Sequence, residues 1–226
     1  TANRGDNPDE MGDDLPAIAL GTGRTATAVT GGVSHTCALL DNAKVKCWGN
    51  NQYGQLGQGD TNNRGDGPSE MGGQLPAIAL GTGRTATAIS AGYDHVCALL
   101  DDGSIKCWGN NQYGQLGLGD VDNRGDGPNE MGDNLPAVNL GTGRTAVAVA
   151  AMTWATCALL DNGAVKCWGR NLSGQLGLGD AANRGGGPNE MGDALPAVNL
   201  GTGRTATVVT AGGQSVCVRL DNGALK

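Results

Sequence analysis

The chain repeats itself every 60 residues, and this period constrains its fold more than any other feature. The tripeptide Asn-Arg-Gly recurs without drift, beginning at Asn3, Asn63, Asn123 and Asn183. A fixed period of this length is typical of solenoids, propellers and repeat arrays, in which each unit buries apolar surface against its neighbours. The sequence therefore divides into repeats 1–60, 61–120 and 121–180 and an incomplete fourth repeat, 181–226.

Composition and charge narrow the classes of partner. The formal net charge is −7, which disfavours nucleic acid or an anionic membrane surface as the main partner, because both require a basic footprint. No apolar run is long enough to predict a membrane span. The 41 glycines recur at fixed positions in each repeat, which indicates turns rather than disorder.

Each repeat predicts four short antiparallel strands, and no segment has a helical period. In the first repeat these strands are 15–20, 25–30, 36–40 and 44–48, with a turn at 21–24. The third strand is almost entirely apolar, as expected for a strand covered on both faces. Lys44 and Lys46 alternate along the fourth, where charge would protect an outer edge strand. Four such strands form one propeller blade, so we predict an all-β fold.

Three runs in each repeat resemble a known family. Cys37-Ala-Leu-Leu-Asp-Asn, Val45-Lys-Cys-Trp-Gly-Asn-Asn and Gly54-Gln-Leu-Gly-Gln-Gly-Asp resemble the regulator of chromosome condensation repeat, as do their counterparts within 97–120 and 157–180. The resemblance implies a β-propeller, typically of seven blades. The fourth repeat stops before its last strand, so we expect the chain to form part of a larger propeller or array.

The cysteines predict one disulfide in each complete hairpin. Cys37 and Cys47 flank the turn symmetrically, so they should lie directly opposite in a non-hydrogen-bonded pair, with Cα atoms about 4.5 Å apart. The predicted pairs are Cys37–Cys47, Cys97–Cys107 and Cys157–Cys167, and Cys217 is left unpaired. Buried free thiols in a reducing cytosol are the alternative, and the spacing disfavours zinc. Repeated disulfides indicate an extracellular, cell-surface or periplasmic protein.

Other motifs favour structural roles. The Arg-Gly-Asp tripeptides at Arg4, Arg64 and Arg124 fit loop residues that hydrogen-bond the backbone better than an integrin ligand. The acidic loop 6–14 is best interpreted as solvated, with a calcium site as the alternative, and we predict no other metal or cofactor. The only histidines, His35 and His95, are expected to hydrogen-bond a neighbouring loop. Because no catalytic set is evident, we predict a protein that is not an enzyme.

Positions that differ between repeats are the candidates for binding. They lie at the start of the third strand and after the Trp-Gly pair, in loops expected at one rim of the propeller, where partners dock. Tyr, Trp and Arg at such positions are typical interface anchors, although neutral drift would also vary exposed loops. The candidates are Ser34, His35, Tyr53, Tyr93, Asp94, His95, Tyr113, Trp154, Arg170 and Gln214.

The leading functional hypothesis is a non-enzymatic extracellular or cell-surface module that binds a protein or surface ligand through these rim loops. The second is structural: a fibre or adhesin stalk in which disulfide-stiffened repeats assemble into longer arrays. A third is that the chain is one part of a larger enzyme or receptor. The activity that the resemblance implies, nucleotide exchange on a nuclear GTPase, is disfavoured by the acidic charge and the predicted disulfides.

Overall fold

The computed structural model describes residues 6–226, so Arg4 and Gly5 of the first Arg-Gly-Asp tripeptide lie outside the described residues. This range contains strands and three short 3-10 turns but no α-helix. The strands are β1 (Ala26–Gly31), β2 (His35–Leu40), β3 (Val45–Gly49), β4 (Ala86–Ala91), β5 (His95–Leu100), β6 (Ile105–Gly109), β7 (Ala146–Ala151), β8 (Ala155–Leu160), β9 (Val165–Gly169), β10 (Ala206–Gly212) and β11 (Ser215–Leu220). The turns are η1 (Gly12–Asp14), η2 (Gly132–Asn134) and η3 (Gly192–Ala194). Within 6–226 no helix is long and apolar enough to cross a membrane.

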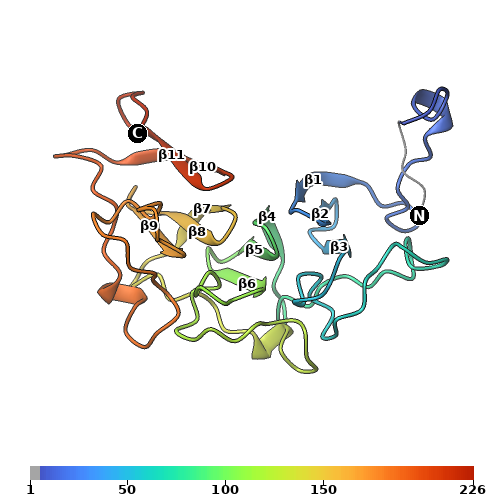
Figure 1. The fold of residues 1–226 in the computed structure, drawn as a ribbon, viewed down its shortest axis with the longest axis horizontal. Helices are drawn as coiled ribbons and strands as arrows, with labels where there is room; N and C mark the ends of the chain where they lie inside the picture. The colour runs from blue at the N-terminus through green and yellow to red at the C-terminus, as the bar shows by residue number, and fades with distance from the viewer. Residues whose placement is uncertain (1–5) are drawn as a thin grey trace.

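The strands form four antiparallel sheets that follow one another around an arc (Figure 1). Three sheets have the order β1-β2-β3, β4-β5-β6 and β7-β8-β9, and the last pairs β10 with β11. The first strands of the sheets lie on the inner side of the arc, where β1 contacts β4, β4 contacts β7 and β7 contacts β10. We call each sheet with its loops a blade. The predicted all-β class is confirmed.

The prediction of four strands in each blade is wrong, because the sheets have three strands or fewer. The segment expected to be the first strand of the second repeat, 75–80, is extended but lies against β3 of the first repeat. There it makes one backbone bond, from Ile78 N to Val45 O at 2.8 Å. Its proline, Pro76, has no N–H to donate to a ladder. The segment therefore connects two blades instead of beginning one.

The expectation that Lys46 protects an outer edge strand is also wrong. Its side chain is buried, as are those of Lys106 and Lys166. The Lys46 amine donates to the carbonyls of Leu20 and Gly72, at 2.9 and 2.7 Å, which belong to two consecutive repeats. The lysine stem is therefore covered while its amine is satisfied by backbone oxygens. Each of these lysines joins adjacent repeats, whereas Lys44 remains exposed.

The predicted cross-strand disulfides are confirmed. Cys37 pairs with Cys47 in the β2–β3 register, with Cα atoms 4.1 Å apart, and the other two predicted bonds are present. Leu40 N donates to Lys44 O at 2.8 Å and closes the hairpin as expected. All six sulfurs belong to fully buried residues, and Cys217 is free.

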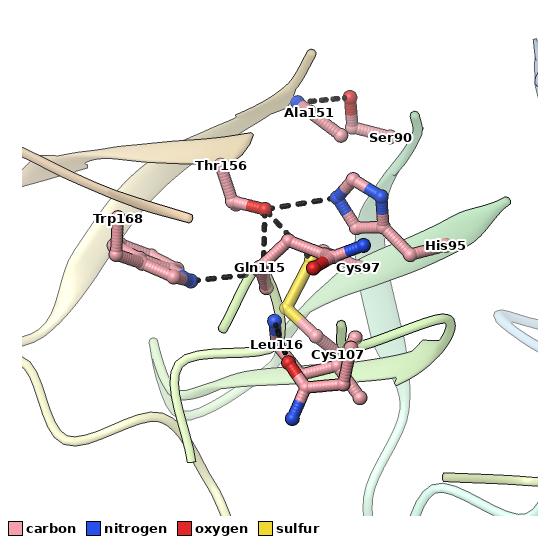
Figure 2. The surroundings of a disulfide bond; sticks show 10 residues. Ser90, His95, Cys97, Cys107, Gln115, Leu116, Ala151, Thr156 and Trp168 are labelled. Atoms are coloured by element: carbon pink, nitrogen blue, oxygen red, sulfur yellow. Dashed lines mark hydrogen bonds between the residues drawn. A yellow bond between two sulfur atoms is a disulfide. The ribbon is translucent and has the colours of Figure 1, made fainter. Parts of the chain in front are cut away.

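Hydrogen bonds tie the first three blades to one another at both ends of their inner strands. Ala86 N donates to Ala43 O at one end of β4, and Ala91 N donates to the Thr30 hydroxyl at the other. The same contact recurs one blade later, where Ala151 N donates to the Ser90 hydroxyl at 2.9 Å (Figure 2).

Buried tryptophans also join neighbouring blades. Trp108 and Trp168 are completely buried, and each indole N–H donates to a carbonyl in the loop of the preceding repeat: Gln55 O at 3.1 Å and Gln115 O at 3.0 Å. The loop passes close to the indole at a glycine, since a Cβ added to Gly117 would lie 2.7 Å from Trp168 Nε1. The pocket that holds each indole therefore requires a glycine in the loop of the preceding repeat.

Substituting Gly117 should be more damaging than substituting an equally strained glycine elsewhere. Gly117 and Gly143 both have positive φ, at 70° and 65°, but nothing lies within 4 Å of a Cβ at Gly143. Gly143→Ala should cost about 1–2 kcal/mol of unfolding free energy from backbone strain alone. Gly117→Ala should cost a further ~1–3 kcal/mol because the methyl group displaces the Trp168 indole. Urea denaturation of both variants measures the difference. Equal losses of unfolding free energy would contradict the close contact between Gly117 and the Trp168 indole.

Removing one disulfide should destabilise the protein measurably. Cys97→Ala/Cys107→Ala should lower the free energy of unfolding by about 2–4 kcal/mol, because the cross-link restricts the unfolded chain. Cys217→Ala is the control, since that thiol forms no disulfide. Urea denaturation would contradict the expectation if the double variant lost no more stability than the control.

Candidate functional site

Apart from the two buried histidines, the candidate residues from the variable positions lie at one rim of the blades. In every complete repeat the loop between the first two strands is bonded to the loop after the third. Asn50 N donates to Ser34 O, Asn110 N to Asp94 O and Arg170 N to Trp154 O, at 2.8–2.9 Å. The two variable loops of each repeat therefore form a single surface.

The rim loops are also bonded to one another around the arc. Val33 N donates to Tyr93 O at 3.2 Å, Tyr93 N to Thr153 O at 3.0 Å and Thr153 N to Gly213 O at 2.8 Å. Each bond joins one blade to the next. The rim is thus a connected backbone framework, and the positions of its side chains are fixed by their neighbours.

Four of the candidate residues meet between the second and third blades. The ring centroid of Trp154 lies 5.6 Å from that of Tyr93 and 5.9 Å from that of Tyr113. The Arg170 guanidinium carbon lies 4.9 Å from the Trp154 centroid and 5.6 Å from the Tyr113 centroid. These distances suit aromatic pairs and cation–π contacts. We call Tyr93, Tyr113, Trp154 and Arg170 the rim cluster.

The rim cluster is accessible from solvent. Tyr93 is 38% exposed, and the other three side chains are half-buried. Such a surface offers apolar area that is already ordered, together with one cation. It is chemically suited to contact another molecule.

The remaining candidates lie outside the cluster. Asp94 accepts a hydrogen bond from Gln55 Nε2 at 3.4 Å, and burial raises the pKa of its carboxyl group. Ser34 is exposed, and Tyr53 makes no ring contact within the described part of the chain. Gln214 lines a separate groove between the third and fourth blades, beside Ser173 and Val216.

Both histidines lie beneath the rim surface rather than on it. His95 is fully buried, and its Nε2 is 3.0 Å from the hydroxyl of Thr156 in strand β8 of the next blade, so its hydrogen bond is made to a neighbouring strand and not to the loop that was expected (Figure 2). The hydrogen bond expected for His35 is not formed within the described residues, because the repeat equivalent of Thr156 is Val96, and both ring nitrogens of His35 are buried without a hydrogen-bond partner. Burial lowers the pKa of His35 to about 4; burial and then the charge of His35 lower that of His95 to about 3.

The sequence analysis did not detect that the residue three positions before each histidine varies together with it from repeat to repeat. A Cβ at Gly32 or Gly92 would lie within 2.2 Å of the ring of His35 or His95, so a histidine here requires the glycine. In the third repeat the same two positions hold Met152 and Ala155, both buried. Comparing the two positions across the first three repeats would have revealed that one large side chain fills the site in each of these blades.

The Arg-Gly-Asp loops are held by internal bonds. The Arg64 guanidinium donates to the carbonyls of Asn62 and Asn63 and pairs with Asp60, as predicted for a structural loop. The amides of residues 65–67 donate to the carboxylate of Glu70 at 2.8–3.1 Å. In residues 6–226, which include the acidic loop 6–14, no three His, Cys, Asp or Glu side chains gather closely enough to hold a metal ion.

Comparison with known proteins identifies the family. One model of the regulator of chromosome condensation (RCC1) repeat matches residues 44–99 and 102–159, about half of the chain, and a second matches 26–55, 86–115 and 147–175. This chain belongs to the RCC1 repeat family. The ultraviolet-B receptor UVR8 of Arabidopsis thaliana is 32% identical over 175 residues, which are 77% of this chain and 36% of the receptor.

Solved structures support the propeller fold. Yeast RCC1 (Prp20), in a crystal structure with Kap60, has a TM-score of 0.65 at 21% identity, over 92% of this chain and 44% of that one. The ectodomain of the Physcomitrella patens receptor kinase CR4 has a TM-score of 0.53 at 20% identity, over 93% and 41%. This RCC1 repeat chain therefore spans less than half the length of each of these relatives.

The buried histidines should make stability fall in mild acid. The folded-state pKa of His35 is about 4, whereas an unfolded histidine titrates near 6.5. Between these values the unfolded chain binds more protons, so the free energy of unfolding falls as pH decreases, by about 3 kcal/mol for His35 over the whole window. Above pH 6.5 the histidine is neutral in both the folded and the unfolded state, so it no longer makes the free energy of unfolding depend on pH. Urea denaturation across this pH range measures the effect.

The chain supplies its own control for this titration. Gly32→Met/His35→Ala copies the pair found at Met152 and Ala155 and removes one buried imidazole. A Cβ at position 32 would also lie 2.6 Å from the Gly92 carbonyl oxygen, so the backbone must shift and the comparison uses the dependence of stability on pH instead of its absolute value. The variant should lose the His35 part of the pH dependence while the carboxylates continue to titrate as before. An unchanged slope would contradict the assignment of the slope to His35.

Proposed function

We propose that this chain is part of a non-enzymatic protein-binding propeller that acts through the rim cluster at the cell surface or outside the cell. The observation that carries the proposal is the meeting of Tyr93, Tyr113, Trp154 and Arg170 across two blades. Tyrosine, tryptophan and arginine are the residue types that dominate the binding energy of protein interfaces. Here all three types share one partly exposed surface.

The rim is pre-organised for binding. The backbone of Tyr93 is bonded to that of Thr153, and the backbone of Arg170 to that of Trp154. Three of the four cluster residues are also half-buried against one another. A partner would therefore lose little binding energy to the ordering of loops or side chains. Yeast RCC1, whose structure was determined with the protein Kap60 bound, is a precedent for protein binding by a protein that contains this fold.

The disulfides are the basis for proposing that the protein acts at the cell surface or outside the cell. Every complete hairpin in residues 6–226 carries one, and such bonds persist in oxidising compartments. The CR4 ectodomain provides an example of this fold outside a cell. Nucleotide exchange on a nuclear GTPase is disfavoured for the same reason, since the nucleus keeps thiols reduced. Both histidines, which would be the first candidates for catalysis, are buried.

A quantitative pull-down from the surface fraction of the source cells tests the proposal. Trp154→Ala should weaken recovery of a specific partner by about 30-fold, the effect of losing one interface hot spot. Arg144→Gln is the matched control, because Arg144 lies at the opposite end of the third blade and pairs with Asp161. Equal recovery by the wild type and Trp154→Ala would count against binding at the rim. Continuous filaments of the purified protein in electron micrographs would instead favour a fibre.

A further inference from the structure

Arg170 differs from most other arginines in residues 6–226 in having no carboxylate partner there. Nine arginines lie in residues 6–226, and seven of them pair with aspartates. Of the other two, Arg219 donates its Nε to the Thr207 hydroxyl at 3.2 Å. Arg170 makes no side-chain hydrogen bond or ion pair within the described range. In a chain with a net charge of −7, an arginine left unpaired requires an explanation.

The guanidinium of Arg170 is nevertheless held in place. It lies over the rings of Trp154 and Tyr113, at 4.9 and 5.6 Å from their centroids. Its Nε is buried without a partner, whereas its two terminal nitrogens are not among the buried unpartnered atoms. The two rings contact the flat face of the Arg170 guanidinium. The N–H groups of its two terminal nitrogens therefore remain free to donate to a ligand.

The cation occurs at only one of the equivalent positions. The first two repeats have Asn50 and Asn110 in place of Arg170, and each amide oxygen accepts a bond from the glutamine of its own loop, Gln55 or Gln115, at 2.9–3.0 Å. The residues equivalent to Trp154 are Ser34 and Asp94, which offer no indole face. At this position the third repeat therefore has an arginine whose side-chain N–H groups make no hydrogen bond within the described residues. The first two repeats have an asparagine that is hydrogen-bonded within its own loop.

We infer that the rim cluster binds an acidic segment of a partner protein by pairing one of its carboxylates with Arg170. A carboxylate matches the two-pronged donor geometry of a guanidinium, and the pair is strengthened where aromatic rings exclude water. Tyr93, the most exposed ring of the cluster, would pack against an apolar residue beside that carboxylate. A long polyanion is disfavoured because it would be repelled by the net charge of −7, whereas one carboxylate meets the unpaired cation locally. The inference rests on the proposed function and adds the chemistry of the partner.

Selection from a library of random linear peptides displayed on phage tests this inference. The folded wild-type chain is the target, and each recovered peptide is then titrated against Trp154→Ala, Arg170→Gln, Arg170→Lys and the control Arg144→Gln. We expect peptides that contain Asp or Glu and that bind both Arg170→Gln and Trp154→Ala at least about tenfold more weakly. Arg170→Lys should recover only part of the affinity, because lysine keeps the charge but not the planar donor pair. Replacing the peptide's own Glu by Gln should produce the same loss as Arg170→Gln.

The outcomes separate the two proposals. Neutral peptides that depend on Trp154 but bind Arg170→Gln normally would overturn carboxylate recognition and leave protein binding at the rim intact. If no recovered peptide depends on Trp154, the proposed function and the inference both fail. Circular dichroism of each variant establishes that it is folded before binding is compared.

Discussion

The structure depends on the contact that Trp108 and Trp168 each make with the loop of the preceding repeat. The indoles of Trp108 and Trp168 are completely buried and are fixed by a single N–H donor to a backbone carbonyl. Burial of so large an apolar side chain is among the strongest stabilising contributions that one residue can make. It also fixes the distance between neighbouring blades. The same spacing separates the rim loops of neighbouring blades. Residues of two repeats are therefore close enough to contact one another in the rim cluster.

Much of the fold could be predicted from the sequence because the relevant interactions are local. The hairpin from Cys37 to Cys47 is defined by its turn and by the symmetric placement of the two cysteines about that turn, so its register and disulfide were both predictable. The segment 75–80 was mispredicted because its partner, β3, belongs to the previous repeat. Lys46 was mispredicted for a related reason: the carbonyls that satisfy its amine come from segments 26 residues away on either side.

The candidate site could be predicted only in part. Differences between repeats singled out the residues of the rim cluster without indicating which of them touch. Tyr93 and Tyr113 come from the second repeat, whereas Trp154 and Arg170 come from the third. Their contact requires that the loops of consecutive blades lie side by side, which the inter-blade backbone bonds establish. The burial of His35 and His95 depended on the paired glycines, a relation that appears only when two positions are compared together.

Because each blade contacts mainly its immediate neighbours, the boundaries between blades are nearly independent of one another. The boundary between the second and third blades has acquired an indole and a guanidinium, while that between the first and second retains its asparagine and glutamine pair. A duplicated array of this kind can diversify one boundary at a time while the others preserve the scaffold. New recognition can therefore arise from two or three substitutions in a single copy, without a compensating change elsewhere in the chain.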